Sequence, residues 1–319
     1  MKVIFQFSNC LQHHQVMSTG PRTVHAYACF GKNGSVQPWE YQSRPLGAED
    51  VEIKISHCGI CGSDLHMMDC GWKSTRYPCV VGHEIVGEVT LAGSDVKGWR
   101  SVTASERKVG TYNGTYKNDG ATSYGGYADY IRVTHEYAFK IPDNIPSDVA
   151  APLLCAGTTV FTPFKEFAKA MGAAAVVAFS RSANKEQEIR RLGADEFVVY
   201  TDEKQAADAA NSVDILLITA DANDMPYMLF LSFLAVRGTC IMVGLPNDDV
   251  KFNAFGVVGK GASFKGSMIG SIQDIKDMLE VASKKNVRPV IQKLPMSKVN
   301  EGIQMVRDGT ARYRVVLEN

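Results

Sequence analysis

The chain has 319 residues, a length that predicts about two domains. It carries 34 acidic and 34 basic residues, so its formal net charge is zero. Proteins that bind nucleic acid or an anionic membrane usually have a basic excess, so neither partner is expected. Apolar residues make up 45% of the chain, enough for an ordinary core. No apolar run approaches the roughly 18 residues that would predict a membrane span.

The amino-terminal stretch MKVIFQFSNCLQHHQV starts with a short apolar run and turns polar from Ser8. The run is too short for the apolar region of a secretory signal. We therefore expect residues 1–20 to form a disordered leader, and Met17 is an alternative translation start. The eight cysteines are irregularly spaced, which favours reduced thiols and a cytoplasmic location.

Residues 22–160 contain short runs rich in Gly, Thr, Tyr and Val, the pattern of strands joined by turns. Strands are predicted at VHAYACF, VEIKISHC, EIVGEVTLAG and YADYIRV. From about residue 170, predicted strands (AAAVVAFS, EFVVY, VDILLITA, TCIMVGL) alternate with predicted helices (SANKEQEIRRLGAD, DEKQAADAAN, MPYMLFLSFLAVRG). A last helix is predicted at SIQDIKDMLEVASKKN, before the tail returns to the first pattern.

This alternation predicts an α/β domain with a parallel sheet covered on both faces. We expect it to be inserted before the end of the β-rich domain. The expected boundaries are 21–160 with 285–319 for the β-rich domain, and 161–284 for the α/β domain.

The stretch HCGICGSDLH raises the question of a metal site, because Cys58 and Cys61 have half of a zinc finger's spacing. No second pair of ligands and no basic patch follows, which excludes a zinc-finger binding module, whereas two ordinary buried thiols stay possible. A catalytic zinc takes three protein ligands that can lie far apart in sequence. GHEIVGEV offers His83 and Glu84 in an apolar setting, where they are costly unless paired or metal-bound. LLCAGTTV offers Cys155.

The ordered set HCGICGSDLH, GHEIVGEV, APLLCAGTTV and AFSRSANK resembles the zinc-containing medium-chain alcohol dehydrogenase family, from about Thr23 to the carboxyl terminus. It is most similar to the cinnamyl alcohol dehydrogenase type, which includes fungal NADP-dependent members. The resemblance implies a GroES-like β-rich catalytic domain and a Rossmann-type doubly wound sheet. It also implies an oxidoreductase that transfers hydride between NADP(H) and an aldehyde or primary alcohol.

Site residues follow from the same resemblance. It implies one catalytic zinc ion at Cys61, His83, Glu84 and Cys155, with Cys58 only packing nearby. It implies a proton relay from Ser63 to His66, and Asp64 as the group that orients a ligand. Trp72 and Tyr77 lie between these motifs and are candidates for lining the substrate pocket.

The cofactor is predicted from the segment after a Rossmann strand, where an acid usually holds the ribose of NAD. AFSRSANK has no acid there, and its basic and hydroxyl groups suit the 2′-phosphate of NADP. The candidates are Ser180, Arg181, Ser182 and Lys185, although Lys185 also fits an ordinary helix surface. The resemblance adds Thr159, Thr219, Gly244, Ser267, Met268 and Ile269.

Two segments of the family pattern are missing. A lobe with four cysteines for a structural zinc should precede VGTYNGTY, but no cysteine lies between Cys79 and Cys155. We therefore expect no structural zinc. TPFKEFAKAMGAAAVVAFS also omits the first Rossmann strand and the Gly-rich loop that holds the pyrophosphate. Both gaps have clean edges, which favours a misread or alternatively spliced gene.

Loss of the first strand should leave a hole between its neighbours in the sheet, or force them to pair differently. Two interpretations stay open: an active reductase or dehydrogenase, and a catalytically impaired relative that keeps the zinc site without productive cofactor binding. A homodimer through the cofactor domain is the family's common assembly, and the damaged sheet argues against it.

Overall fold

The computed structural model describes residues 3–5, 19–96, 110–117, 119–171 and 175–319. The chain forms two compact units, which are described separately. The first unit contains Met1–Thr158 and Ser271–Asn319, and the second contains Thr159–Gly270. The second unit ends at Gly270, whereas the sequence pattern placed the boundary at 284.

Helix α8 (Ile272–Lys284) accounts for this difference, because it belongs to the first unit. The sulfur of Met278 lies in contact range of Gly157, and the Ser283 hydroxyl donates a 2.8 Å hydrogen bond to Asn144 Oδ1. Strand–helix alternation predicts that a helix covers a sheet, but it does not specify which sheet.

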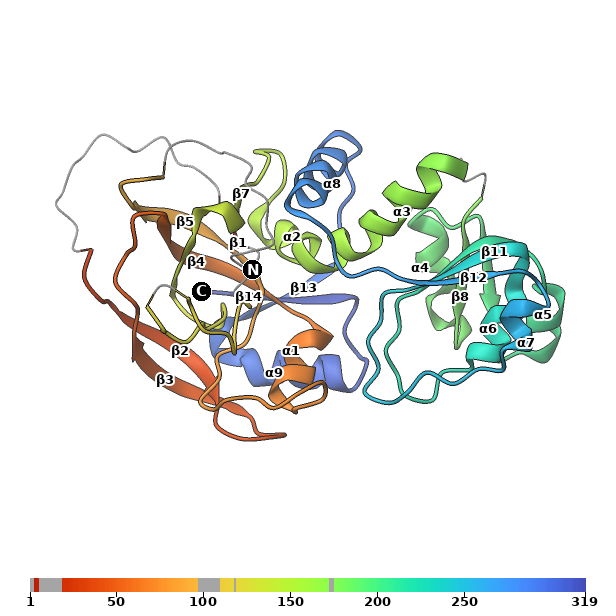
Figure 1. The fold of residues 1–319 in the computed structure, drawn as a ribbon, viewed down its shortest axis with the longest axis horizontal. Helices are drawn as coiled ribbons and strands as arrows, with labels where there is room; N and C mark the ends of the chain where they lie inside the picture. The colour runs from red at the N-terminus through yellow and green to blue at the C-terminus, as the bar shows by residue number, and fades with distance from the viewer. Residues whose placement is uncertain (1–2, 6–18, 97–109, 118, 172–174) are drawn as a thin grey trace. The chain divides into compact units, whose positions relative to one another are not determined.

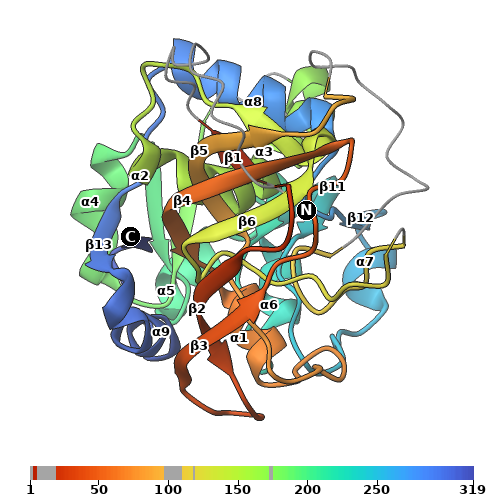
Figure 2. The same cartoon turned by 90° about the vertical axis from the view of Figure 1, so that its left-hand side faces the viewer.

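The main sheet of the first unit has seven strands in the order β13-β14-β4-β5-β1-β7, with β6 paired to β4. Figure 2 shows β4, β5 and β6 running side by side. The strands are β1 (Val3–Phe5), β4 (Asp50–Ile60), β5 (Glu84–Ala92), β6 (Tyr130–Thr134), β7 (Ala138–Lys140), β13 (Ile291–Pro295) and β14 (Arg314–Glu318). A separate antiparallel pair consists of β2 (Thr23–Cys29) and β3 (Val36–Gln42). The four strands predicted in this region are confirmed as β2, β4, β5 and β6.

Strand β1 corrects part of the expectation for residues 1–20. It pairs in parallel with both β5 and β7, so Val3–Phe5 belongs to the sheet rather than to a leader outside it. The short apolar run VIF can therefore join a ladder between two strands. Residues 6–18 lie outside the described residues, and so does Met17.

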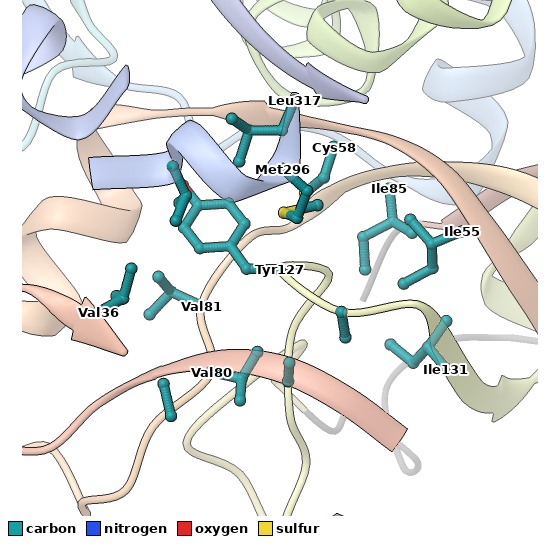
Figure 3. Close-up of a cluster of buried hydrophobic side chains, with 14 of the residues drawn as sticks. Val36, Ile55, Cys58, Val80, Val81, Ile85, Tyr127, Ile131, Met296 and Leu317 are labelled. Atoms are coloured by element: carbon teal, nitrogen blue, oxygen red, sulfur yellow. The ribbon is translucent and has the colours of Figure 1, made fainter. Parts of the chain in front are cut away.

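Apolar side chains from these strands form the core of the first unit. The fully buried members include Ile53, Ile55 and Ile60 of β4, Ile85 of β5, and Tyr127. Figure 3 shows Tyr127 among neighbouring core side chains such as Val81 and Met296. The other helical segments of the unit are α1 (Gly62–Met68), η1 (His135–Tyr137), α2 (Ser147–Pro152), η2 (Leu153–Gly157), η4 (Met296–Lys298) and α9 (Val299–Arg307).

The second unit alternates helices and strands, as the sequence pattern predicts (Figure 1). Its strands are β8 (Val177–Ser180), β9 (Glu196–Val199), β10 (Val213–Ile218), β11 (Leu234–Met242) and β12 (Ser263–Gly266). Its helical segments are α3 (Thr158–Met171), η3 (Ala183–Lys185), α4 (Glu186–Arg191), α5 (Glu203–Asp208), α6 (Tyr227–Phe233) and α7 (Phe255–Val258).

The parallel strands of the second unit form two separate sheets. β8 pairs with β9, and β10, β11 and β12 form a second sheet. Within the described residues, no strand joins the two. This is the hole that the missing first strand predicts, since in a doubly wound order that strand lies between these halves. The aromatic ring of Phe179 in β8 stacks on Phe233 at the end of α6, with centroids 4.6 Å apart.

Candidate metal centre

The register between two strands brings the motifs HCGICGSDLH and GHEIVGEV together. β4 and β5 are antiparallel, and Gly59 near the end of β4 faces Glu84 at the start of β5. Cys61 follows β4 directly and caps the amino end of α1, while His83 directly precedes β5. Because these strands pair in antiparallel fashion, Cys61 and His83 lie at the same end of the sheet although they are more than twenty positions apart in sequence.

Cys155 reaches the same place from a different element. It lies in η2, a π-helical segment between α2 and α3. Single π-helical turns inside α-helices occur frequently at functional sites, because the wider turn redirects a side chain. The Sγ atoms of Cys155 and Cys61 are 3.8 Å apart.

Among the described residues, one group has the composition of a metal site. Ligand atoms of Cys61, His83, Glu84 and Cys155 all lie within 4.8 Å of one another. Two thiols, an imidazole and a carboxylate are the donors that zinc prefers. Cys58 is not part of the group: it is fully buried in the core of the first unit.

The two thiols share a proton in this arrangement. A hydrogen bond from Cys155 lowers the pKa of Cys61 well below its usual value, against the effect of burial. The same hydrogen bond, together with burial, raises the pKa of Cys155 well above its usual value. Metal ligation requires thiolates, so the lowered pKa of Cys61 favours the binding of an ion.

Asp64 connects the segments that carry the candidate ligands. Its carboxylate is fully buried and accepts the backbone N–H of Cys61 at 3.0 Å and that of Gly82 at 3.0 Å. Its Oδ1 also lies 2.8 Å from Nδ1 of His83. Burial acts to lower the pKa of His83, but Asp64 and Tyr112 outweigh it, and the pKa lies well above its usual value. Asp64 therefore contacts His83 and also holds the backbone beside Cys61 and Gly82.

Glu84 is fully buried, and one of its oxygens pairs with the Arg314 guanidinium of β14. Among the described residues, its second oxygen, Oε2, has no hydrogen-bond partner. Burial raises the pKa of Glu84 to about 7, although Arg314 opposes this. A Cβ at residue 59 would come 1.8 Å from Oε2, so only glycine leaves room for this carboxylate. An unpartnered buried oxygen beside two thiols and an imidazole fits a site built for a cation.

The two relay candidates lie on α1. The Oγ of Ser63 is 3.7 Å from Sγ of Cys61, so its hydroxyl lies beside the candidate ligands. His66 follows one helical turn later, and its ring stacks on Trp72 with centroids 4.6 Å apart. Tyr77, the other pocket candidate, donates its hydroxyl to the Met68 carbonyl at 2.7 Å.

The candidate cofactor residues lie in the second unit, mostly at the carboxyl ends of its parallel strands. Ser180 ends β8, and Arg181 and Ser182 follow it on the surface, with Lys185 in η3. Thr219 follows β10 directly, and Gly244 lies two residues after β11, with the Ala220 carbonyl so close that no side chain would fit. Ser267, Met268 and Ile269 follow β12, and Thr159 lies in the first turn of α3.

Two neighbours of the candidate ligands had no role in the sequence interpretation. Arg314 lies in the carboxyl-terminal tail, to which the sequence interpretation gave no role in the site. Tyr112 lies in no motif, and its hydroxyl is 3.2 Å from Nδ1 of His83. The segment expected to hold a structural zinc in the family, around RSVTASERK, lies outside the described residues. No described helix is long and apolar enough to cross a membrane.

Comparison with known proteins places the chain in one family. The family described as alcohol dehydrogenase GroES-like domain matches residues 47–143, and that described as zinc-binding dehydrogenase matches 165–284. An 8-hydroxygeraniol dehydrogenase of Catharanthus roseus is 32% identical, covering 95% of this chain and 98% of the relative. The chain therefore belongs to the zinc-containing medium-chain alcohol dehydrogenase family, and it is an alcohol dehydrogenase by descent.

Solved structures agree with this assignment. A cinnamyl alcohol dehydrogenase from Sorghum bicolor has a TM-score of 0.85 at 30% identity, covering 93% of this chain and 98% of that one. A cinnamyl alcohol dehydrogenase from Helicobacter pylori, solved with NADP(H), has a TM-score of 0.83 at 26% identity with the same coverage. The alignment to the Catharanthus relative spans 354 residues, more than the 319 of this chain, so residues of the relative lie opposite gaps.

Proposed function

We propose that this chain is a zinc-dependent oxidoreductase that transfers hydride between NADP(H) and an aldehyde or primary alcohol. The observation that carries the proposal is the convergence of Cys61, His83, Glu84 and Cys155 within 4.8 Å. Three of them, Cys61, His83 and Cys155, would hold the ion, and Glu84 would supply a carboxylate that approaches it. A zinc ion bound there supplies the Lewis acidity that polarises an aldehyde oxygen or acidifies an alcohol.

The chain's own residues would orient the substrate and move its proton. Ser63, beside Cys61, both accepts and donates through its hydroxyl, so it can pass a proton to or from the substrate oxygen. His66 lies three residues further along the same helix, on the same face, and carries the proton onward. Its stacking on Trp72 holds the imidazole ring in one plane. Asp64 orients the ring of His83 through the contact of its carboxylate with Nδ1.

The exposed segment after β8 supports NADP(H) as the hydride source. Arg181 and Lys185 can pair with a 2′-phosphate, and Ser180 holds the turn by donating its hydroxyl to the Ser182 carbonyl at 3.0 Å. Thr201 donates to the Arg181 carbonyl at 2.7 Å, which fixes the backbone that presents the guanidinium. The Helicobacter relative is titled as a complex with NADP(H).

The split sheet of the second unit supports a second candidate function. A relative that has lost the strand and loop preceding β8 would keep its metal centre in the first unit but would lack the backbone that holds a pyrophosphate. Such a chain binds zinc and does not turn over.

Nucleotide binding separates the two candidates. NADPH would be titrated into the purified full-length protein while its fluorescence is followed, with NADH as the control and zinc content measured in the same sample. Saturable binding that prefers NADPH, followed by reduction of cinnamaldehyde, is the expected result for the enzyme. A folded, zinc-containing sample that binds neither nucleotide would support the inactive relative.

A further inference from the structure

The hydroxyl of Tyr112 lies beside His83, one of the candidate metal ligands. It lies 3.2 Å from Nδ1 of His83, and the two rings meet edge to face with centroids 5.9 Å apart. Burial raises the pKa of Tyr112 well above its usual value, and Asp64 adds to this. As a phenol, the group offers one O–H donor and one acceptor oxygen.

The positions of the hydrogens shared by Asp64, His83 and Tyr112 can be assigned by counting donors and acceptors. Asp64 accepts two backbone N–H groups, and a carboxylate offers only acceptor oxygens to its neighbours. The 2.8 Å contact between Asp64 Oδ1 and His83 Nδ1 then requires the proton on Nδ1. Tyr112 cannot donate to a nitrogen that carries a hydrogen. Its oxygen shares the Nδ1 hydrogen, and its own hydrogen goes to Asp64.

We infer that Tyr112 is a positioning residue of the metal centre: with Asp64 it fixes the tautomer and ring orientation of His83, which leaves Nε2 as the ligand nitrogen. The inference rests on the metal centre proposed above. A ligating histidine usually gives its other N–H to a carboxylate or carbonyl. Here the second group is a phenol that holds both the histidine and the carboxylate, so the ring has two fixed contacts instead of one.

Tyr127 provides a matched control within the same unit. It is fully buried, and its hydroxyl has no hydrogen-bond partner among the described residues. Tyr127→Phe removes the same atom as Tyr112→Phe from a buried ring, but it breaks no contact to the metal centre. A purely structural role for Tyr112 predicts the same behaviour from both variants.

The experiment measures zinc affinity by competition with a chromophoric chelator, using zinc alone and no cofactor or substrate. Tyr112→Phe should bind zinc about tenfold more weakly than wild type, at the lower end of the range for groups that support a ligand. Tyr127→Phe should stay within about twofold of wild type. The Co²⁺-substituted Tyr112→Phe variant should also show altered visible absorption, because the ligand field depends on how the imidazole is oriented.

Equal zinc affinity and equal Co²⁺ spectra for folded Tyr112→Phe and wild type would overturn the inference. Failure of wild type itself to bind zinc would instead overturn the proposed metal centre. If Tyr112→Phe does not fold, ¹⁵N NMR of zinc-loaded wild type tests the tautomer of His83 on which the inference depends. A proton on Nδ1 of His83 is expected, and a proton on Nε2 would contradict the assignment.

Discussion

The two units of the molecule differ in how their sheets are held together. The first unit keeps an unbroken seven-stranded sheet, and the candidate metal ligands depend on the register of β4 and β5 within it. The second unit has the β8–β9 pair and the β10–β12 sheet with no strand between them in the described chain. A site can keep its geometry without a segment of the family pattern when the strands that position its residues pair with one another and not with that segment.

Charged pairs show the same contrast. In the first unit, Glu52 and Arg132 have side chains that are 0% and 2% exposed, and Arg132 NH2 lies 2.7 Å from Glu52 Oε2. In the second unit, Lys204 and Asp208 are 85% and 65% exposed on one face of α5. Buried pairs cannot be broken without a large penalty, whereas exposed pairs contribute little. The first unit is therefore much more tightly specified by its polar contacts.

The largest expected effect comes from removing a candidate ligand. Cys61→Ser should weaken zinc binding on the order of a thousandfold, since each ligand of such a site contributes several kcal/mol. Cys58→Ala is the control, because Cys58 is buried in the core outside the metal group, and zinc affinity should not change. The zinc content that each variant retains after dialysis against a chelator measures both effects. Equal loss of zinc in the two variants would assign the CxxC pair jointly to the metal and break the proposed ligand set.

The buried pair should give the next largest effect. Glu52→Gln leaves the Arg132 guanidinium buried without a charge partner, which should lower the free energy of unfolding by about 3–5 kcal/mol. Asp208→Asn removes an exposed partner of Lys204 and should leave the unfolding midpoint unchanged. Urea unfolding followed by circular dichroism measures both variants. A small effect of Glu52→Gln would mean that the carbonyl oxygens of Gly20 and Arg44, to which Arg132 also donates, satisfy the guanidinium without the lost charge.

The sequence was sufficient to predict features that depend on local residue patterns. The candidate ligands lie in short motifs, and β2, one of the strands predicted from the sequence, shows alternating burial. The hole in the second unit was likewise predictable, because a missing central strand must separate its neighbours. Contacts set by long-range register were not predictable. The partner of Glu84 is Arg314, 230 positions away, and no local signal connects them.

The helix predicted at MPYMLFLSFLAVRG was wrong in its second half. The structure ends α6 at Phe233 and starts β11 at Leu234, where Leu234 pairs with Val213 of β10. An apolar run of this length fits a buried helix and a buried strand equally well. The ladder to β10 decides between them, and a local pattern cannot contain that information.

Hydrogen exchange should reveal the difference between the units directly. A two-stranded sheet is only marginally stable, so amides of β8 and β9 should exchange about a hundredfold faster than those of β4 and β5. Saturating NADPH should slow exchange at the end of β8 if the nucleotide binds there. Equal protection in all four strands would mean that packing such as the Phe179–Phe233 stack closes the gap as firmly as a strand would.

The smallest expected effect concerns the cofactor preference. Arg181→Ala should weaken NADPH binding about tenfold and leave NADH binding unchanged, because the guanidinium is expected to contact only the 2′-phosphate. Arg191→Ala removes the same charge from the exposed carboxyl end of α4 and should alter neither affinity. Fluorescence titrations measure the dissociation constants of both nucleotides for each variant, and hence the ratio of NADPH to NADH affinity. If Arg181→Ala weakens both nucleotides equally, the arginine acts on a group that they share. The split sheet would then have moved the binding mode away from the one that the strand ends predict.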